Sequence, residues 1–478
     1  MTITQNLEAY IRNGQIKEAS EILSGIKINQ IPVNELYLYA QFSIRVQNYL
    51  LALQILSKNM NDHRDGIKQI STEEMETYIT ALIKLGLFKN SKNLLQELNP
   101  TKNPRYHDLE ARIAMAQWDY EVALKHCNKY LDTIRKDSYQ HLVGKLNLAA
   151  SLVGVESFEE AIESLIEIEK EAKSQNYKLI LGNSYELLAQ AHIKIGKYVE
   201  ARDHLNSCMK VFGNEESIWS FYVKKWDFFM ETYNDRDPKV LMTQGRLLLN
   251  EATQKSYYED VREIERHLAL CLGDDERLLR VYTGTPYTAY RKKLISKYQL
   301  IVPSTITTEF GPKVTESIIF DYRNYFKDQT KLLSCFEILM KDFFKPISLG
   351  FIFDHLYKDE FFDSETSPQR IYAIIRRVRE SIPEKYKIDI NHHNYGTQIL
   401  FNKNIQLELS TKEGIVDSEK RDSVELRDHF KRNWFTTSDV AKLTHKSPTT
   451  AKRLIEQAKK NYKIEIQGKG RATRYRFK

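Results

Sequence analysis

The sequence predicts a mostly α-helical protein, in which an N-terminal helical solenoid is followed by two small α+β domains. Three observations lead to this fold class. A pattern of paired amphipathic helices recurs along residues 1–213. Alternating apolar residues and turn residues, typical of strands, appear in the later part of the chain. The last residues are strongly basic. At 478 residues the chain is also too long for a single hydrophobic core, so several domains are expected.

Residues 1–213 contain six copies of one helix-pair pattern. The clearest copy is NSYELLAQAHIKIGKYVEARDHLNSC, in which Gly196 separates two apolar helix faces. Each copy has a small residue in its second helix, where two helices must cross closely. The copies resemble tetratricopeptide repeats, and their intervals of 33, 39, 32, 38 and 40 residues scatter around that family's period of about 34. The small residues are Ala19, Ala52, Ser91, Ala123, Ala161 and Ala201.

Residues 214–300 continue the helical pattern without keeping the repeat frame, and we interpret them as further degenerate repeats or a cap. The segment EDVREIERHLALCLGDDERLLRVY predicts two helices that meet at Gly273 and Asp274. A helical solenoid has a concave surface suited to a protein or peptide. Binding of such a partner is the favoured interpretation. Self-association into a homo-oligomer and a purely spacing role are the alternatives.

Residues 314–405 predict a small α+β domain. The preceding segment VPSTITTEFGP is expected to be a linker, because Pro303, Gly311 and Pro312 break regular structure. The segment ESIIFDYRNYFKD alternates in the manner of strands. Two helices with a break at a Lys-Pro pair should follow, and Ser348 is the expected cap of the second one.

A third helix, SPQRIYAIIRRVRESI, is expected to begin with Ser367 as its cap, and a hairpin turning at 394–396 should follow it. This order, with the stretches IIRRVRESI and NYGTQILF, resembles the winged-helix output domain of OmpR/PhoB-type response regulators. The wing departs from that family, because Thr397 and Gln398 stand where a basic residue is usual. The expected buried stripe is Ile371, Ile375 and Val378. By the resemblance, the residues facing DNA are Arg370, Arg376 and Arg377.

Residues 423–478 predict three helices and a second hairpin. The first helix is SVELRDHFKRN, and Thr437 or Ser438 should cap the second. Ser447 should cap the third helix, with Pro448 as its first residue. The segment YKIEIQGKGRATRYRF then gives two strands about a glycine-rich turn. The expected apolar faces are Val440, Ala441 and Leu443 in the second helix and Ala451, Leu454, Ile455 and Ala458 in the third.

This C-terminal unit follows a polar linker, 406–422, and resembles the winged helix-turn-helix of many bacterial regulators. In that motif the recognition helix places its N-terminal residues in the major groove, while basic residues reach phosphate. By the resemblance, the base-reading candidates are Thr449, Thr450, Lys452 and Arg453. The phosphate-contacting candidates on the wing are Lys469, Arg471 and Arg474, with Arg476 as a further one.

Charge also separates the C-terminal unit from the rest of the chain. Residues 423–478 hold 15 Lys and Arg against five Asp and Glu, whereas residues 1–422 hold 56 against 59. An excess of this kind at one end indicates a polyanion-binding surface. A solvated lysine-rich surface is the alternative, but here the basic residues follow the pattern of a helix and a hairpin.

Several functional classes are not expected. The start, MTITQNLEAYIRNG, has no signal-peptide pattern, and no run of about 18 apolar residues suggests a membrane span. A cytoplasmic protein without membrane contact is therefore expected. The four cysteines are scattered without metal or redox spacing, and His392 and His393 fit an exposed turn, so neither a cofactor nor a metal is expected. Metalloprotease, nucleophile-elbow and Walker motifs are absent, which favours a protein that is not an enzyme.

Taken together, these patterns predict a DNA-binding transcriptional regulator. Its C-terminal units would bind double-stranded DNA, and its repeats would bind a protein or peptide partner. One alternative is a non-catalytic scaffold whose winged helices contact protein or RNA. Another is an architectural protein that binds DNA without preferring a sequence.

Overall fold

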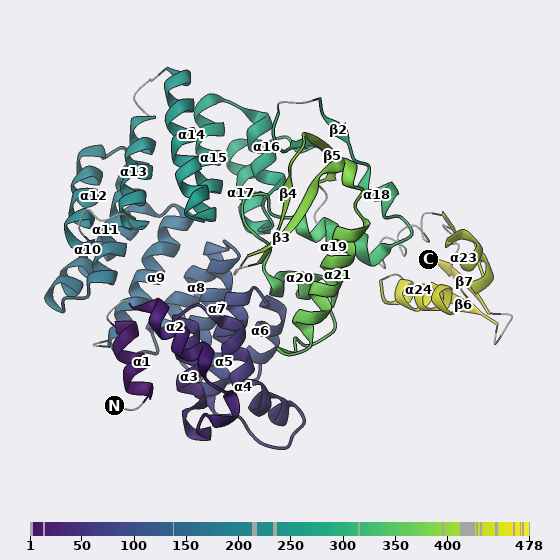
Figure 1. Ribbon diagram of the computed structural model, residues 1–478, viewed down its shortest axis with the longest axis horizontal. Helices are drawn as coiled ribbons and strands as arrows, with labels where there is room; N and C mark the ends of the chain where they lie inside the picture. Colours follow the sequence, from purple (N-terminus) through teal and green to yellow (C-terminus); the bar gives the residue numbers. More distant parts are fainter. Residues whose placement is uncertain are drawn as a thin grey trace.

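In the computed structural model, a curved stack of helices leads into a small mixed unit and then into a C-terminal unit (Figure 1). The mostly α fold class is confirmed, because helices fill the first three hundred residues and the described strands all follow residue 304. The structure describes residues 3–12, 15–136, 138–212, 218–232, 237–313, 316–393, 396–411, 426, 429–430, 433–444, 448–461, 464–468, 470 and 473–477.

Six helix pairs occupy the six predicted repeats. Each of the six predicted small residues is completely buried where the two helices of its pair cross, which confirms the tetratricopeptide-like solenoid. Ser71 and Glu74 form a capping box at the start of the third pair, and Gly86 ends that pair's first helix at a φ of 80°. The pairs are α1 (Ile3–Arg12) with α2 (Ile16–Gly25), α3 (Leu36–Arg45) with α4 (Tyr49–Arg64), α5 (Thr72–Leu85) with α6 (Phe88–Leu95), α7 (Arg105–Ala116) with α8 (Tyr120–Leu131), α9 (Tyr139–Val155) with α10 (Phe158–Ser174), and α11 (Lys178–Lys194) with α12 (Tyr198–Phe212). Two 3-10 turns, η1 (Ile28–Gln30) and η2 (Val33–Glu35), precede α3.

Five further helices continue the stack. The predicted pair around Gly273 and Asp274 is confirmed, since Gly273 ends one helix and the Asp274 carboxylate accepts a hydrogen bond from the Arg277 amide at the start of the next. The last helix returns to the fifth repeat, where Lys293 Nζ donates to the carbonyl oxygen of Gly154 at 3.0 Å. The helices are α13 (Ile218–Glu231), α14 (Pro238–Gln254), α15 (Tyr258–Leu272), α16 (Asp275–Thr283) and α17 (Thr288–Tyr298).

The mixed unit begins with a strand where a linker was expected. Pro303 and Gly311 flank this strand rather than breaking it, because the β-branched residues between them pair with a later strand. The segment expected to form strands is strand only at 318–319 and helix at 322–325, so that prediction was largely wrong. The sheet has the order β1-β5-β2. Its members are β1 (Thr305–Phe310), β2 (Ile318–Ile319) and β5 (Ile405–Ser410), with the short helix α18 (Tyr322–Tyr325) after β2.

Three helices and a hairpin complete the mixed unit. The Ser348 hydroxyl accepts a hydrogen bond from the Phe351 amide, which confirms the predicted cap. Ser367 does not act as the predicted cap, because its hydroxyl accepts from the Asp363 amide instead and the helix already includes Ser367. The predicted stripe of two isoleucines and a valine on the third helix is fully buried. The elements are α19 (Thr330–Leu339), α20 (Leu349–Leu356), α21 (Ser367–Ser381), the 3-10 turn η3 (Glu384–Tyr386), β3 (Ile388–His393) and β4 (Gly396–Phe401).

The mixed unit shares its hydrophobic core with the repeats. One cluster of buried apolar side chains extends from Leu7 to Ile113 in the first repeats and from Phe310 to Leu409 in the mixed unit. The range 314–405 therefore does not enclose a separate core, and the sheet also extends beyond it to β1 and β5.

The C-terminal unit has a core of its own, formed by residues from Leu426 to Phe477. Pro448 begins α24 as predicted, and the four predicted apolar residues of this helix are buried. The cap of α23 lies one residue earlier than expected, because the Thr436 hydroxyl accepts from the Asp439 amide. Val440 is buried as predicted, whereas Ala441 and Leu443 are only half-buried. Ser447 lies outside the described residues. The elements are α23 (Thr437–Thr444), α24 (Pro448–Asn461), β6 (Ile464–Gln467) and β7 (Arg474–Phe477).

Candidate nucleic-acid interface and its junction with the repeats

Helix α24 separates a buried apolar face from a basic face. Lys452 and Arg453 are exposed, and Thr450 is half-buried beside them. The opposite side of the helix packs into the C-terminal core. The side chain of Thr449 lies outside the described residues. The exposed lysine and arginine sit in the first two turns of the helix, where a recognition helix makes its contacts.

The β6–β7 hairpin adds further basic side chains. Arg474 is exposed at the start of β7. Arg476 is held by the protein itself, because it donates to Glu465 at 2.7 Å and lies 4.6 Å from the ring centre of Trp434. Lys469 and Arg471 lie outside the described residues. Arg474 is thus the described wing residue best placed to reach a phosphate.

The three predicted arginines of α21 lie in different surroundings. Arg377 is exposed, and Arg376 is exposed within 3.8 Å of Glu380. Arg370 instead donates to both carboxylate oxygens of Glu360, at 2.6 and 3.0 Å, and lies over the ring of Tyr357. This bidentate pair ties Arg370 to Glu360 in the turn before α21.

Sequence patterns did not predict the junction between α20 and the repeats, which is held by buried and half-buried polar contacts. The Asp354 carboxylate on α20 accepts hydrogen bonds from the Lys89 amide and from Asn90 Nδ2, both at 2.9 Å. Asn90 Oδ1 in turn accepts from the Phe362 amide at 3.0 Å. A β-carbon added at Gly350 would clash with the carbonyl oxygen of Leu85. Only glycine therefore lets α20 approach this closely.

Residues 358–364, which connect α20 to α21, continue the same junction. The ring of Phe361 stacks on Tyr78, and the Arg64 guanidinium lies 3.9 Å from the centre of the Phe361 ring. Lys89 Nζ donates to the carbonyl oxygen of Lys358. Gln54 Nε2 lies 3.5 Å from the carbonyl oxygen of Ser364. Side chains from α4, α5 and α6 thus cover the turn that leads into α21.

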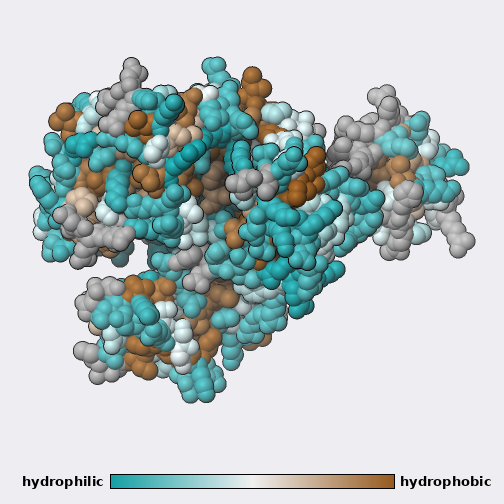
Figure 2. Space-filling view, turned by 45° about the horizontal axis from the view of Figure 1, so that its top comes forward, coloured by the Kyte–Doolittle hydropathy of each residue, from teal (hydrophilic) through white to brown (hydrophobic). Residues whose placement is uncertain are grey.

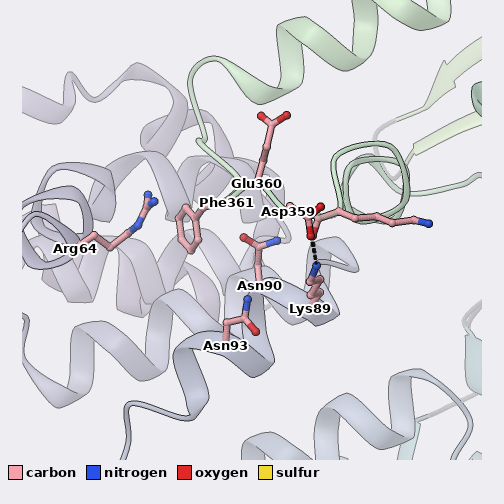
Figure 3. A pocket seen from close by; sticks show the side chains of 8 residues that line it. Arg64, Lys89, Asn90, Asn93, Asp359, Glu360 and Phe361 are labelled. Atoms are coloured by element: carbon pink, nitrogen blue, oxygen red, sulfur yellow. Dashed lines mark hydrogen bonds and ion pairs between the residues drawn. The ribbon is translucent and has the colours of Figure 1, made fainter. Parts of the chain in front are cut away.

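A pocket of about 390 Å³ opens at this junction (Figure 3). Its lining mixes cations, carboxylates, amides and one aromatic ring. Lys89 lies 3.6 Å from Asp359 across the pocket mouth. Arg64 also lies over the ring of Phe361, and both charge signs are present, so the lining favours no particular ligand. The lining residues are Arg64, Lys89, Asn90, Asn93, Lys358, Asp359, Glu360 and Phe361.

Burial changes the protonation of the junction. It raises the pKa of Asp354 to about 6, although the hydrogen bonds from Lys89 and Asn90 favour the carboxylate. Burial also lowers the pKa of His355, on the same helix, to about 4. His355 is therefore neutral at physiological pH. Asp354 is mostly ionised at that pH, although its burial disfavours the charged form.

The opposite side of the mixed unit is joined to the last repeats. The fully buried Arg262 forms an ion pair with Asp342. Lys345 lies 3.2 Å from Glu259, and the Phe343 amide donates to the carbonyl oxygen of Gly284 at 3.1 Å. The mixed unit is therefore held between the early repeats and the late repeats.

A cluster of charged side chains joins the inner helices of the later repeats. Buried Lys225 lies 2.6 Å from Asp260 and 2.8 Å from Glu263. The indole of Trp226 donates to Glu186 at 2.7 Å. Burial opposes ionisation of Glu263, but Lys225 and Arg266 outweigh it and lower the pKa of Glu263 to about 2. This cluster ties α11, α13 and α15 together.

Two lysines occupy the same position in different repeats. Lys84 and Lys194 stand in the last turn of α5 and α11, each seven residues before the small residue of the following helix. Both side chains have exposed surface. The surrounding helices still remove part of the water around each ammonium group, and this desolvation lowers the pKa of each lysine. No carboxylate among the described residues forms an ion pair with either ammonium group. Figure 2 shows one face of the molecule, on which apolar side chains are scattered among hydrophilic ones.

Comparisons with known proteins add little to this picture. No protein-family model matches the chain, and no curated protein matches it. A crystal structure of a Rap protein complexed with competence and sporulation factor aligns with 79% of this chain and 98% of that chain, at 11% sequence identity and a TM-score of 0.40. A likeness this distant carries no weight for the ligand or function of the present chain.

Two findings concern membranes and metals. No helix within the described ranges is both long enough and apolar enough to cross a membrane. Across the same part of the chain, no group of three or more His, Cys, Asp or Glu side chains is arranged to hold a metal ion.

Proposed function

We propose that this protein is a DNA-binding transcriptional regulator whose helical repeats bind a protein or peptide, or a second copy of the chain. The observation that carries the proposal is the exposed basic face of α24, which lies opposite a packed apolar core and beside a hairpin that exposes Arg474. A helix of this kind next to a basic hairpin is suited to the major groove and the adjacent phosphates.

The order of elements supports a winged-helix interpretation of both units. In the C-terminal unit, Phe435 precedes α23, α24 and the β6–β7 hairpin, and it forms a bridge with Tyr475 of β7. In the mixed unit, Ile347 precedes α20, α21 and the β3–β4 hairpin, and it forms a bridge with Thr397 of β4. The same arrangement therefore occurs twice in one chain, each time with a basic helix in the position of the recognition helix.

The repeats offer a place for an acidic partner. Lys84 and Lys194 form no ion pair within the described part of the chain, and a carboxylate on a partner would pair directly with either ammonium group. A protein or peptide with acidic side chains fits this surface. We propose no catalytic role, because the sequence carries no metalloprotease, nucleophile-elbow or Walker motif.

A second candidate function is a non-catalytic scaffold. One observation favours it. Helix α20 contacts the repeats through the face that the first helix of a helix-turn-helix usually turns toward DNA. The winged units would then serve as protein-binding or RNA-binding modules.

The proposal is tested by mixing the protein with fragments of its own genome at about 150 mM salt and sequencing the DNA that is retained. The test variant is Arg453→Ala/Arg471→Ala/Arg474→Ala. A matched control removes three exposed lysines from the repeats, Lys125→Ala/Lys197→Ala/Lys210→Ala. A few sharp peaks, lost in the test variant and kept in the control, are expected. Uniform retention would indicate an architectural DNA binder, and no retention would leave the scaffold.

A further inference from the structure

The mixed unit turns its helix-turn-helix face toward the repeats. Gly350 and Asp354 on α20, and residues 358–364 after it, all contact α4, α5 or α6. In a helix-turn-helix bound to DNA, the first helix lies across the phosphate backbone and the second enters the major groove by its N-terminal end. The positions that would meet the backbone are therefore already in contact with protein.

A duplex cannot occupy the same space. The contact at Gly350 leaves no room for even a single carbon atom between α20 and the carbonyl oxygen of Leu85. The turn is also fixed, since Arg370 is bound by Glu360 and the Phe361 ring lies against Tyr78 and Arg64. A phosphate backbone next to α20 would require α20 to leave α5 and α6.

The outer face of α21 nevertheless keeps the character of a DNA-reading surface. Tyr372, Ala373, Arg376 and Arg377 are exposed along it, and none of them takes part in the junction. A helix that served only to dock on the repeats would not need two adjacent exposed arginines outside the junction.

We propose that the N-terminal repeats mask the DNA-binding face of the mixed unit, and that α20 must separate from α5 and α6 before α21 can bind a duplex. This inference rests on the proposed function, because it assumes that the mixed unit binds DNA at all. The C-terminal unit would provide the binding seen in the closed state, and opening of the junction would add a second contact with the same DNA.

The test uses the full-length chain with Arg453→Ala/Arg474→Ala, which removes described basic residues of the C-terminal unit. Gly350→Leu opens the junction by inserting a side chain against Leu85. Phe361→Lys opens it independently, because it removes the ring that stacks on Tyr78 and places a cation beside Arg64. The matched control is Gly25→Leu, a glycine at the end of α2 with no atom within 4 Å of an added β-carbon.

Two readouts keep opening and DNA binding apart. Hydrogen exchange at the Lys89 and Phe362 amides reports whether the junction is open, because both amides donate across it. Affinity for a pool of random-sequence duplexes reports DNA binding. Opening should raise this affinity by about tenfold or more, since masking reduces apparent affinity by the fraction of molecules that are open. Adding Arg376→Ala/Arg377→Ala should remove the gain.

A cross-link tests the opposite direction. A β-carbon at Gly86 would lie 3.7 Å from the Ser348 β-carbon, a separation that a disulfide spans. In the chain that carries Arg453→Ala/Arg474→Ala and an opening substitution at Phe361, oxidised Gly86→Cys/Ser348→Cys protein should lose the α21-dependent binding that its reduced form shows. Cross-linked protein that binds as well as reduced protein would overturn the proposal. The proposal would also be overturned if hydrogen exchange showed an open junction but no DNA binding depended on Arg376 and Arg377. Failure of the unsubstituted protein to bind DNA would instead refute the proposed function.

Discussion

At the scale of single residues, the junction depends on an acid that is costly to ionise. Asp354 is half-buried between α6 and α20, and its two oxygens accept hydrogen bonds from a backbone amide and a side-chain amide. Burial raises its pKa to about 6, compared with about 3.9 for an unperturbed aspartate. An acid with a higher pKa in the folded protein binds protons on folding, so its contribution to stability falls as the pH rises through this interval.

This gives a prediction with a definite sign. Relative to the unsubstituted protein, Asp354→Asn should become more stable as the pH rises from about 4 to about 6. The difference in thermal midpoint should grow by the equivalent of about 1–2 kcal/mol in unfolding free energy and then level off. Scanning calorimetry across this range measures it. The matched control is Asp359→Asn, a fully exposed aspartate five residues further along the chain. A decrease for Asp354→Asn would mean that the ionised carboxylate stabilises the junction.

At the scale of elements, the repeats depend on one small residue at each helix crossing. The six small side chains have no exposed surface, and the paired helices would have to separate to admit a larger one. This is why the pattern could be recognised although the intervals vary from 32 to 40 residues. Turn length can vary without changing the contact between the two helices.

Ala161→Leu is therefore expected to destabilise the repeats by about 1–3 kcal/mol, the usual cost of forcing extra methylene groups into a packed crossing. Ala9→Leu makes the same change at an exposed position of α1 and should have almost no effect. Thermal unfolding followed by circular dichroism compares the two variants. Equal midpoints would show that the α9–α10 crossing is not closely packed.

Local patterns also explain which parts of the candidate site could be predicted. The buried faces of α21 and α24 follow from helical periodicity, which needs only neighbouring residues. The junction could not be read in this way, because Asp354 contacts Lys89 across 265 positions of sequence. Gly350 was the available signal, as a glycine inside an otherwise apolar helix, but it does not say which element approaches it. The strand β1 was missed because its partner β5 lies about a hundred residues later.

At the scale of the whole molecule, the mixed unit joins an early part of the repeat stack to a late part. It contacts α5 and α6 through α20, and it contacts α15 and α16 through the Arg262–Asp342 pair and the Gly284–Phe343 hydrogen bond. A partner that changed the curvature of the repeats would change the distance between these two attachments. The mixed unit is therefore placed where binding to the repeats and exposure of α21 can influence each other.

The salt dependence of DNA binding tests this arrangement in the intact protein. The logarithm of the binding constant should fall linearly with the logarithm of salt concentration, with a slope of about −4 to −5 for four to six phosphate contacts. Arg453→Ala/Arg474→Ala should reduce the magnitude of the slope by about 2, whereas Lys197→Ala, an exposed lysine on the repeats, should leave it unchanged. Gly350→Leu should make the slope steeper, because Arg376 and Arg377 then reach phosphate. Equal slopes for the closed and opened proteins would mean that the C-terminal unit binds DNA alone and that the mixed unit serves only to hold the repeats.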